Sequence, residues 1–202
     1  FKSTVRANIN YTQADADKLL VWIKQDSTTS LLDRSLVSRT VSEGNLVAVS
    51  TNTINENNYN QIFTSVSYNG SSSVSGVLDA NDLTFSDGSG NDKPFTLSCW
   101  VNFTDFSAIH GLVGKGGLAT NREYSLIATT SGAIAFTLTD ESTNAQAVYQ
   151  TSAGVVVAGR WYHIVATYDG SNSHTGQKVY VNSVLQPADA SGTGGSYGGM
   201  EN

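Results

Sequence analysis

Residues 95–103 alternate between apolar and polar side chains, with one exception. Every odd position in this stretch is apolar, and the even positions are polar except for Trp100. Successive side chains of a β-strand point to opposite faces of the sheet, so the pattern predicts a strand with one buried face and one face in water. Trp100 is therefore predicted to lie on the otherwise polar face.

The same period of two recurs downstream, at intervals typical of an antiparallel sandwich. Further strands are predicted at residues 124–128, 133–139, 148–151, 161–168 and 178–184. Weaker signals upstream predict strands at residues 18–24, 46–49, 62–68 and 73–75, an Asn-rich loop at 52–60 and a long polar loop at 79–92. Two sheets packed face to face would bury all of the apolar faces. The predicted fold class is an all-β, antiparallel two-sheet β-sandwich.

Composition limits the partners that such a chain can take. Charged residues make up 14% of the chain and the formal net charge is -6. Lys and Arg do not cluster, which argues against nucleic acid as a partner. No run approaches the ~20 apolar residues of a membrane span, so no membrane insertion is expected. We interpret residues 1–17 as a polar arm and residues 18–202 as one domain.

Several segments resemble, in order and spacing, the strand motifs of laminin-G-like and concanavalin A-like domains. They are PFTLSCWVN at 94–102, LVGK at 112–115 followed by EYSL at 123–126, RWYHIVATYDG at 160–170 and KVYVN at 178–182. The resemblance spans residues 19–202 and implies a concanavalin A-like jelly roll. In this superfamily the chain continues past the segment similar to residues 197–200 into a further strand. We therefore expect the C-terminal end to be incomplete, or its last strand to come from a partner.

The fold also occurs in glycosidases, which need two carboxylates close together, generally at alternate positions of one strand in a sandwich. No such run exists here. Glu123 stands alone, and Asp140 and Glu141 are expected to be solvated turn residues that face different ways. We expect His163 to be a hydrogen-bonded structural residue and Cys99 to be a buried thiol. Catalysis is therefore not expected.

Calcium is the one cofactor that the resemblance raises, as a structural ion, because many relatives bind it. Such an ion needs several oxygen ligands from neighbouring loops. Asp79, Asn81 and Asp82 offer closely spaced oxygen-bearing side chains and form the candidate metal site; the alternative is that they only make Asx turns. In the pentraxin branch an Asp–Asn pair precedes the strand similar to EYSL. Here Asn121 and Arg122 stand at those positions, and the arginine argues against that particular site.

A glycan site would need exposed aromatic rings, because sugar faces stack on rings while their hydroxyl groups take directed hydrogen bonds from polar neighbours. Tyr59, Trp100 and Tyr197 are the candidate ligand-binding residues. The alternatives are that Trp100 only covers the sheet or lies in the core, and that Tyr59 is an inert loop residue.

The expected function is therefore a non-catalytic adhesion or structural module, extracellular or on the surface of a virion, with glycans or neighbouring protein subunits as partners. Low charge and a surface rich in Ser, Thr and Asn are the basis for this hypothesis. The alternatives are a carbohydrate-binding module of a larger secreted enzyme or adhesin and, last, a glycosidase.

Overall fold

The computed structural model describes residues 23–24, 32–33, 41–44, 48–56, 59–68, 74–77, 79–116 and 121–201. The chain divides into two compact units, Phe1–Ala80 and Asn81–Asn202, and each is described by itself. The predicted arm at 1–17 and its boundary with residue 18 lie outside the described residues.

The described residues of the first unit form three antiparallel strand pairs. They are β1 (Ile23–Lys24) with β2 (Leu32–Asp33), β3 (Val41–Gly44) with β6 (Val74–Val77), and β4 (Ala48–Glu56) with β5 (Tyr59–Ser67). The predicted loop at 52–60 is wrong, because β4 and β5 run through most of it. Thr53 and Ile54, whose branched side chains favour strands, interrupt the asparagines and pair with Ile62 and Gln61.

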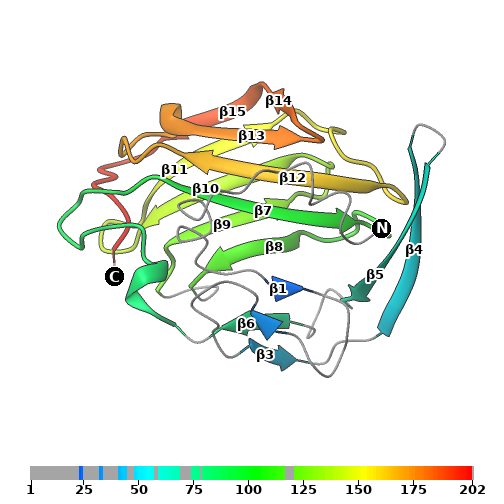
Figure 1. The fold of residues 1–202 in the computed structure, drawn as a ribbon. Helices are drawn as coiled ribbons and strands as arrows, with labels where there is room; N and C mark the ends of the chain where they lie inside the picture. The colour runs from blue at the N-terminus through cyan, green and yellow to red at the C-terminus, as the bar shows by residue number, and fades with distance from the viewer. Residues whose placement is uncertain are drawn as a thin grey trace. The chain divides into compact units, whose positions relative to one another are not determined.

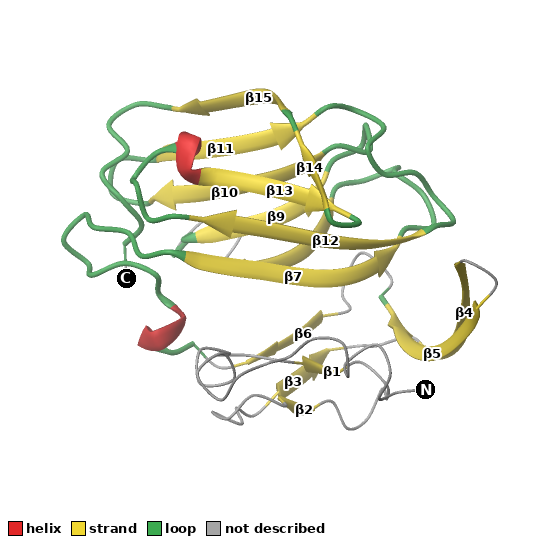
Figure 2. Cartoon of the chain, turned by 45° about the horizontal axis from the view of Figure 1, so that its top comes forward, coloured by secondary structure: helices red, strands yellow, loops and turns green. Residues whose placement is uncertain are grey.

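The second unit holds two antiparallel sheets, which confirms the predicted fold class (Figures 1 and 2). One sheet has the order β15-β11-β10-β9-β8, and the other has the order β14-β13-β12-β7. The strands are β7 (Phe95–Asn102), β8 (His110–Lys115), β9 (Tyr124–Ala128), β10 (Ile134–Asp140), β11 (Ala145–Thr151), β12 (Trp161–Tyr168), β13 (Gln177–Val181), β14 (Val184–Gln186) and β15 (Ala188–Thr193). Short 3-10 helices occur at η1 (Asn81–Leu83) and η2 (His174–Gly176). In the described part of the chain no helix is long and apolar enough to cross a membrane.

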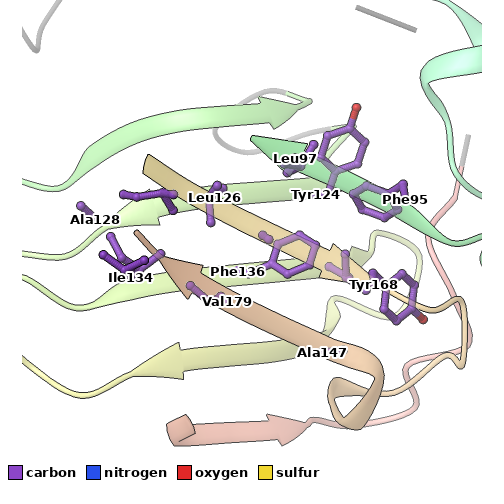
Figure 3. Packing of buried hydrophobic residues seen from close by; sticks show 14 of the residues in the cluster. Phe95, Leu97, Tyr124, Leu126, Ala128, Ile134, Phe136, Ala147, Tyr168 and Val179 are labelled. Atoms are coloured by element: carbon purple, nitrogen blue, oxygen red, sulfur yellow. The ribbon is translucent and has the colours of Figure 1, made fainter. Parts of the chain in front are cut away.

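The core lies between these two sheets, as the period of two predicts. The odd positions of β7 face inward and its even positions are exposed, while in β12 the even positions are buried. Figure 3 shows side chains from both sheets meeting in this layer. In this layer the ring of Phe95 is stacked on Phe85, with centroids 4.3 Å apart, and is edge-on to Phe136 at 5.8 Å. Aromatic burial of this kind is a large contribution to the stability of the sandwich.

Two details of the second unit differ from the sequence prediction. The strand predicted at 178–184 is wrong at its end, because Asn182 and Ser183 adopt positive φ angles of 51° and 68° and turn the chain into β14. Two consecutive residues with positive φ are typical of a tight hairpin turn. β15 was not predicted, since its sequence, ADASGT, is poor in the residues that favour strands, and it forms by pairing with β11.

Candidate functional site

The outer face of the four-stranded sheet carries the large aromatic side chain that interrupts the polar positions of β7. Trp100 lies directly opposite His163 of β12 in the antiparallel register. Its side chain is 54% exposed, which confirms its predicted place on the polar face. Ser98 and Asn102 flank it along the same face of β7, and both are exposed.

The Trp100 ring is held by a stacked neighbour. The indole and the imidazole of His163 are nearly parallel, at 15°, with centroids 5.0 Å apart. The His163 Nε2 atom is 2.8 Å from the Ser98 Oγ, and the His163 backbone N–H donates to the Asn182 Oδ1 at 2.9 Å. Ser98 thus holds the imidazole and Asn182 holds the backbone of His163, so the indole is stacked on a ring with a defined position. We call Trp100, His163, Ser98 and Asn102 the Trp100 platform.

The Trp100 platform favours the uncharged imidazole. Burial lowers the pKa of His163 below its usual value of 6.5, so the ring is neutral at neutral pH. A neutral imidazole has one N–H and one lone pair, and the Ser98 hydroxyl can complement either. The prediction that His163 is a hydrogen-bonded structural residue is confirmed.

The apolar part of this outer face continues from Trp100 toward the edge of the sheet. Val165 of β12 lies opposite Tyr180 of β13, and Tyr180 lies opposite Leu185 of β14. Val165 and Tyr180 are half-buried, while Leu185 is 48% exposed. Apolar surface therefore extends beyond the Trp100 platform toward β14.

A family model described as the concanavalin A-like lectin/glucanases superfamily matches residues 75–199, more than half of the chain. The chain belongs to the concanavalin A-like lectin/glucanase superfamily. No curated protein matches it. The matched region of this concanavalin A-like domain contains all nine strands of the two sheets and the Trp100 platform.

The candidate calcium ligands of the concanavalin A-like domain are exposed. Asp79 lies at the end of the first unit, whereas Asn81 and Asp82 lie in η1 of the second unit. Within the described ranges, no three or more His, Cys, Asp or Glu side chains gather in a way that could hold a metal. A calcium ion at these residues stays a prediction.

The residue that argued against a pentraxin-type calcium site has a structural role. The Arg122 Nε donates to the Glu141 Oε2 at 3.1 Å, and its Nη2 donates to the Asn144 Oδ1 at 2.7 Å. Asn121 beside it is exposed and has a positive φ of 56°. Arg122 therefore joins the start of β9 to the turn after β10 through a partly exposed ion pair.

The other two aromatic candidates, Tyr59 and Tyr197, belong to the first and the second unit, respectively. Tyr59 begins β5 and lies opposite Glu56, and its side chain is outside the description of the structure. Tyr197 was expected to be exposed, and this is wrong. Only 9% of Tyr197 is exposed, and its hydroxyl group donates to the Asp92 Oδ2 at 2.6 Å.

The partner of Tyr197 belongs to a buried polar cluster that sequence reasoning missed. Asp92 also accepts hydrogen bonds from the Tyr168 hydroxyl at 2.9 Å and from the Met200 N–H at 2.7 Å. Burial, with the neighbouring Asp92 carboxylate, raises the pKa of both tyrosines far above their usual value. The Gly198 N–H donates to the Asp140 Oδ2 at 2.9 Å. We call this arrangement the C-terminal clasp; its carboxylates hold the backbone after β15.

The acids that were considered for glycoside hydrolysis are engaged in structural contacts. Glu123 is buried in an ion pair with Lys115 and also accepts a hydrogen bond from Thr84. Asp140 was expected to be solvated, which is wrong, because it is 3% exposed and accepts backbone hydrogen bonds. Glu141 faces Arg122 instead, so the prediction that the two adjacent acids face different ways is confirmed.

The single cysteine is also part of the packing. Cys99 lies on the inner face of β7 and packs against the core. Burial raises the pKa of its thiol to about 12, so the reactive thiolate is scarce at neutral pH. The residue is partly buried, so the predicted buried thiol is confirmed in part.

Proposed function

We propose that this chain is a non-catalytic adhesion module that binds glycans on the outer face of its four-stranded sheet, with Trp100 as the stacking surface. The observation that carries the proposal is the 54% exposure of a tryptophan that is held in place by a stacked histidine. Tryptophan and tyrosine combine a large apolar surface with few rotatable bonds, so a fixed ring loses little entropy when a ligand covers it.

The surroundings of Trp100 match the chemistry of a sugar ring. One face of a pyranose presents C–H groups that pack on an aromatic ring, and its hydroxyl groups need directed polar partners. The exposed side chains of Ser98 and Asn102 lie on either side of Trp100 along β7. Ser98 and Asn102 carry no charge, and burial favours the neutral form of His163, so we propose an uncharged stretch of glycan as the ligand.

A binding role rather than a catalytic one is supported by the positions of the carboxylates. Hydrolysis of a glycosidic bond needs one acid to act as proton donor and another as base or nucleophile on opposite sides of the substrate. Among the described acids, Glu123 is held by Lys115, and Asp92 and Asp140 are buried in the C-terminal clasp. Using any of these in catalysis would first require breaking contacts that the fold depends on.

The proposal includes a place of action outside the cell or on the surface of a virion. It is supported by the low charge of the chain and by its many Ser, Thr and Asn residues. A carbohydrate-binding module of a larger secreted enzyme would use the same Trp100 platform. The full reading frame distinguishes the two, because only the second places a catalytic domain on the same polypeptide.

A glycan array followed by calorimetry tests the proposal, using the full chain, Trp100→Ala and the control Ile109→Ala. Ile109 is 60% exposed but lies on the loop before β8, a strand of the other sheet. We expect the full chain to bind at least one neutral glycan, and Trp100→Ala to lose about tenfold or more in affinity, as expected for a buried aromatic contact. Ile109→Ala should bind like the unmodified chain.

Two results would contradict the proposal. One is no binding to any glycan on the array, and the other is equal binding by Trp100→Ala. Repeating the measurement with a chelator tests the predicted calcium ion separately, since loss of binding that calcium restores would implicate a metal.

A further inference from the structure

Asn102 begins an N-glycosylation sequon, the pattern Asn-X-Ser/Thr in which X is not proline. The three residues are Asn102, Phe103 and Thr104. The same pattern begins at Asn10 and Asn69, which lie outside the described residues. A sequon can carry a sugar in the folded protein only where the asparagine side chain reaches solvent. Asn102 is exposed at the end of β7, so its position meets this condition.

The side-chain amide of Asn102 takes no part in holding the fold. Within the described ranges, none of the side-chain hydrogen bonds involves it. By contrast, four other asparagines use their amides in contacts with neighbouring segments, namely Asn91, Asn144, Asn172 and Asn182. A substituent on the amide nitrogen of Asn102 therefore breaks no contact among the described residues.

Two tryptophans flank Asn102 on the outer face of the four-stranded sheet. Trp100 precedes it by two residues along β7, and Trp161 of β12 lies directly opposite it in the antiparallel register. Neighbours on one face of a strand are about 6.5 Å apart, and the Cβ atoms of opposite residues are about 5 Å apart. Trp100 is 54% exposed and Trp161 is half-buried. The Asn102 amide is thus bordered by aromatic surface along its own strand and across the sheet.

The first sugar of an N-linked glycan has the shape that such a surface accepts. This sugar is N-acetylglucosamine in the β configuration, and all of its ring substituents are equatorial. Its axial C–H groups therefore gather on the faces of the ring and can pack on an aromatic side chain. Because the sugar is joined directly to the Asn102 nitrogen, it meets the tryptophans without the entropy cost of bringing a free ligand to the site.

We propose that Asn102 is a site of N-linked glycosylation whose first N-acetylglucosamine packs on Trp100 and Trp161. In the transfer, the Asn102 nitrogen attacks the anomeric carbon of an oligosaccharide carried on a lipid pyrophosphate. A C–N bond replaces the C–O bond to phosphate, the nitrogen loses one proton, and the lipid pyrophosphate leaves. Phe103, the middle residue of the sequon, is only 3% exposed in the folded domain, so the transfer takes place before β7 joins the sheet.

This modification has a consequence for the Trp100 platform, and the consequence alone rests on the proposed function. One face of the Trp100 ring is stacked on His163, which leaves the other face for a sugar. An external glycan and the sugar on Asn102 therefore compete for the same surface. The attached sugar has the advantage of a high effective concentration. Glycosylation of Asn102 thus closes the Trp100 platform to external glycans.

Glycopeptide mass spectrometry of the full chain, secreted from a eukaryotic cell behind an added secretion signal, tests the modification. We expect a glycan on the peptide that contains Asn102. Thr104→Ala removes the hydroxyl group that the transferase requires and should abolish this glycan, whereas Thr104→Ser should keep it. Thr104 is exposed, so both variants should fold. A secreted chain with an unmodified Asn102 would overturn the proposal.

An endoglycosidase that leaves one N-acetylglucosamine on each modified asparagine allows the packing to be tested. Hydroxyl radicals oxidise exposed indole rings, and mass spectrometry measures the rate. We expect oxidation of Trp100 to be several-fold slower in the trimmed chain than in Thr104→Ala from the same cells, which keeps any sugar at the other two sequons. The same two chains made in bacteria without N-linked glycosylation should be oxidised at equal rates. Equal rates in the trimmed chain and Thr104→Ala would overturn the contact with Trp100.

Calorimetry with a neutral glycan that binds the bacterial chain tests the competition. We expect the trimmed chain to bind this glycan about tenfold or more weakly than Thr104→Ala from the same cells, because the aromatic contact is occupied. Equal affinities would overturn the closure of the Trp100 platform and leave glycan binding intact. If no glycan binds the bacterial chain, the proposed function is wrong, and mass spectrometry and oxidation still decide whether Asn102 is modified and where its sugar packs.

Discussion

The hydroxyl group of Tyr197 donates a hydrogen bond to the Asp92 Oδ2 at 2.6 Å, across 105 positions of sequence. Met200 donates its backbone N–H to the other oxygen of the same carboxylate at 2.7 Å. One buried acid just before β7 thus holds the segment that follows β15. This contact explains how a glycine-rich stretch without strand or helix reaches the core.

Removing one hydroxyl from this cluster should destabilise the fold. Tyr197→Phe leaves a lone pair of the buried Asp92 carboxylate without its donor, so we expect a loss of about 1–3 kcal/mol in the free energy of unfolding. Tyr180→Phe, on the half-buried outer face of β13, is the control and should change little. Chemical denaturation measures both, and equal effects would contradict the role assigned to the C-terminal clasp.

The C-terminal clasp should also contribute less to stability at low pH, because the Asp140 carboxylate becomes protonated. Burial, the largest influence, raises the pKa of Asp140, but hydrogen bonds from Gly198, Thr143 and Ser142 outweigh it and hold the pKa below its usual 3.8. The folded state therefore favours the carboxylate, and its stabilising effect is present above 3.8 and is lost as the pH falls through the lowered pKa.

The variant Asp140→Asn removes this titration. Its free energy of unfolding should fall less steeply with acid than that of the unmodified chain. If Asp140→Asn showed the same slope as the unmodified chain, the contribution assigned to Asp140 would be wrong.

The stability of the fold should also depend on pH through His163, and it should again be lower in acid. Burial lowers its pKa below 6.5, so folding favours the neutral ring. Its stabilising effect is complete above 6.5 and is lost as the pH falls through 6.5 toward the lowered pKa, because the unfolded chain takes up the proton first. Proton NMR of the imidazole measures the pKa in the folded protein. A value at or above the usual one would contradict the packing of His163 beneath Trp100.

Gly132 and Gly154 have nearly the same backbone conformation, so Ala substitutions at the two positions distinguish backbone strain from steric contact. Gly132 has a φ of +70°, and a Cβ atom there would come within 2.4 Å of the Val156 carbonyl oxygen. Gly154 has a φ of +74° and no atom within 4 Å of such a Cβ. Both Ala variants have the strain of a positive φ, but only Gly132→Ala adds a steric clash. We therefore expect Gly132→Ala to lower the free energy of unfolding by more than about 1 kcal/mol beyond the effect of Gly154→Ala. Equal melting temperatures for the two variants would show that this close approach is absent.

Alternation in sequence carried most of the information about the two sheets. The pattern in residues 95–103 predicted the buried and exposed faces of β7 and the outward position of Trp100. In a strand with one face in water, every second side chain points into the core and is therefore apolar. The segment 161–168 was predicted with the bounds that β12 has. Strands with strong periodicity and many β-branched or aromatic residues can be predicted from their own sequence, without knowledge of the strands that pair with them.

Features that depend on pairing or on distant contacts were not predictable in this way. β15 consists of residues that do not favour strands, and only its register with β11 makes it one. The buried role of Asp92 could not be predicted from its local sequence, because its partners Tyr168, Tyr197 and Met200 are more than seventy residues away. The stacking of His163 on Trp100 likewise depends on how β7 and β12 pair.

The most direct test of glycan binding at the Trp100 platform is NMR of the indole N–H groups. The chain has three tryptophans, and Trp100→Phe identifies the signal of Trp100. Titration with a glycan that binds on the array should shift this signal most, with saturation at the dissociation constant found by calorimetry. If the signal of Trp100 stays unchanged while the glycan binds, the binding site lies elsewhere and the central claim is wrong.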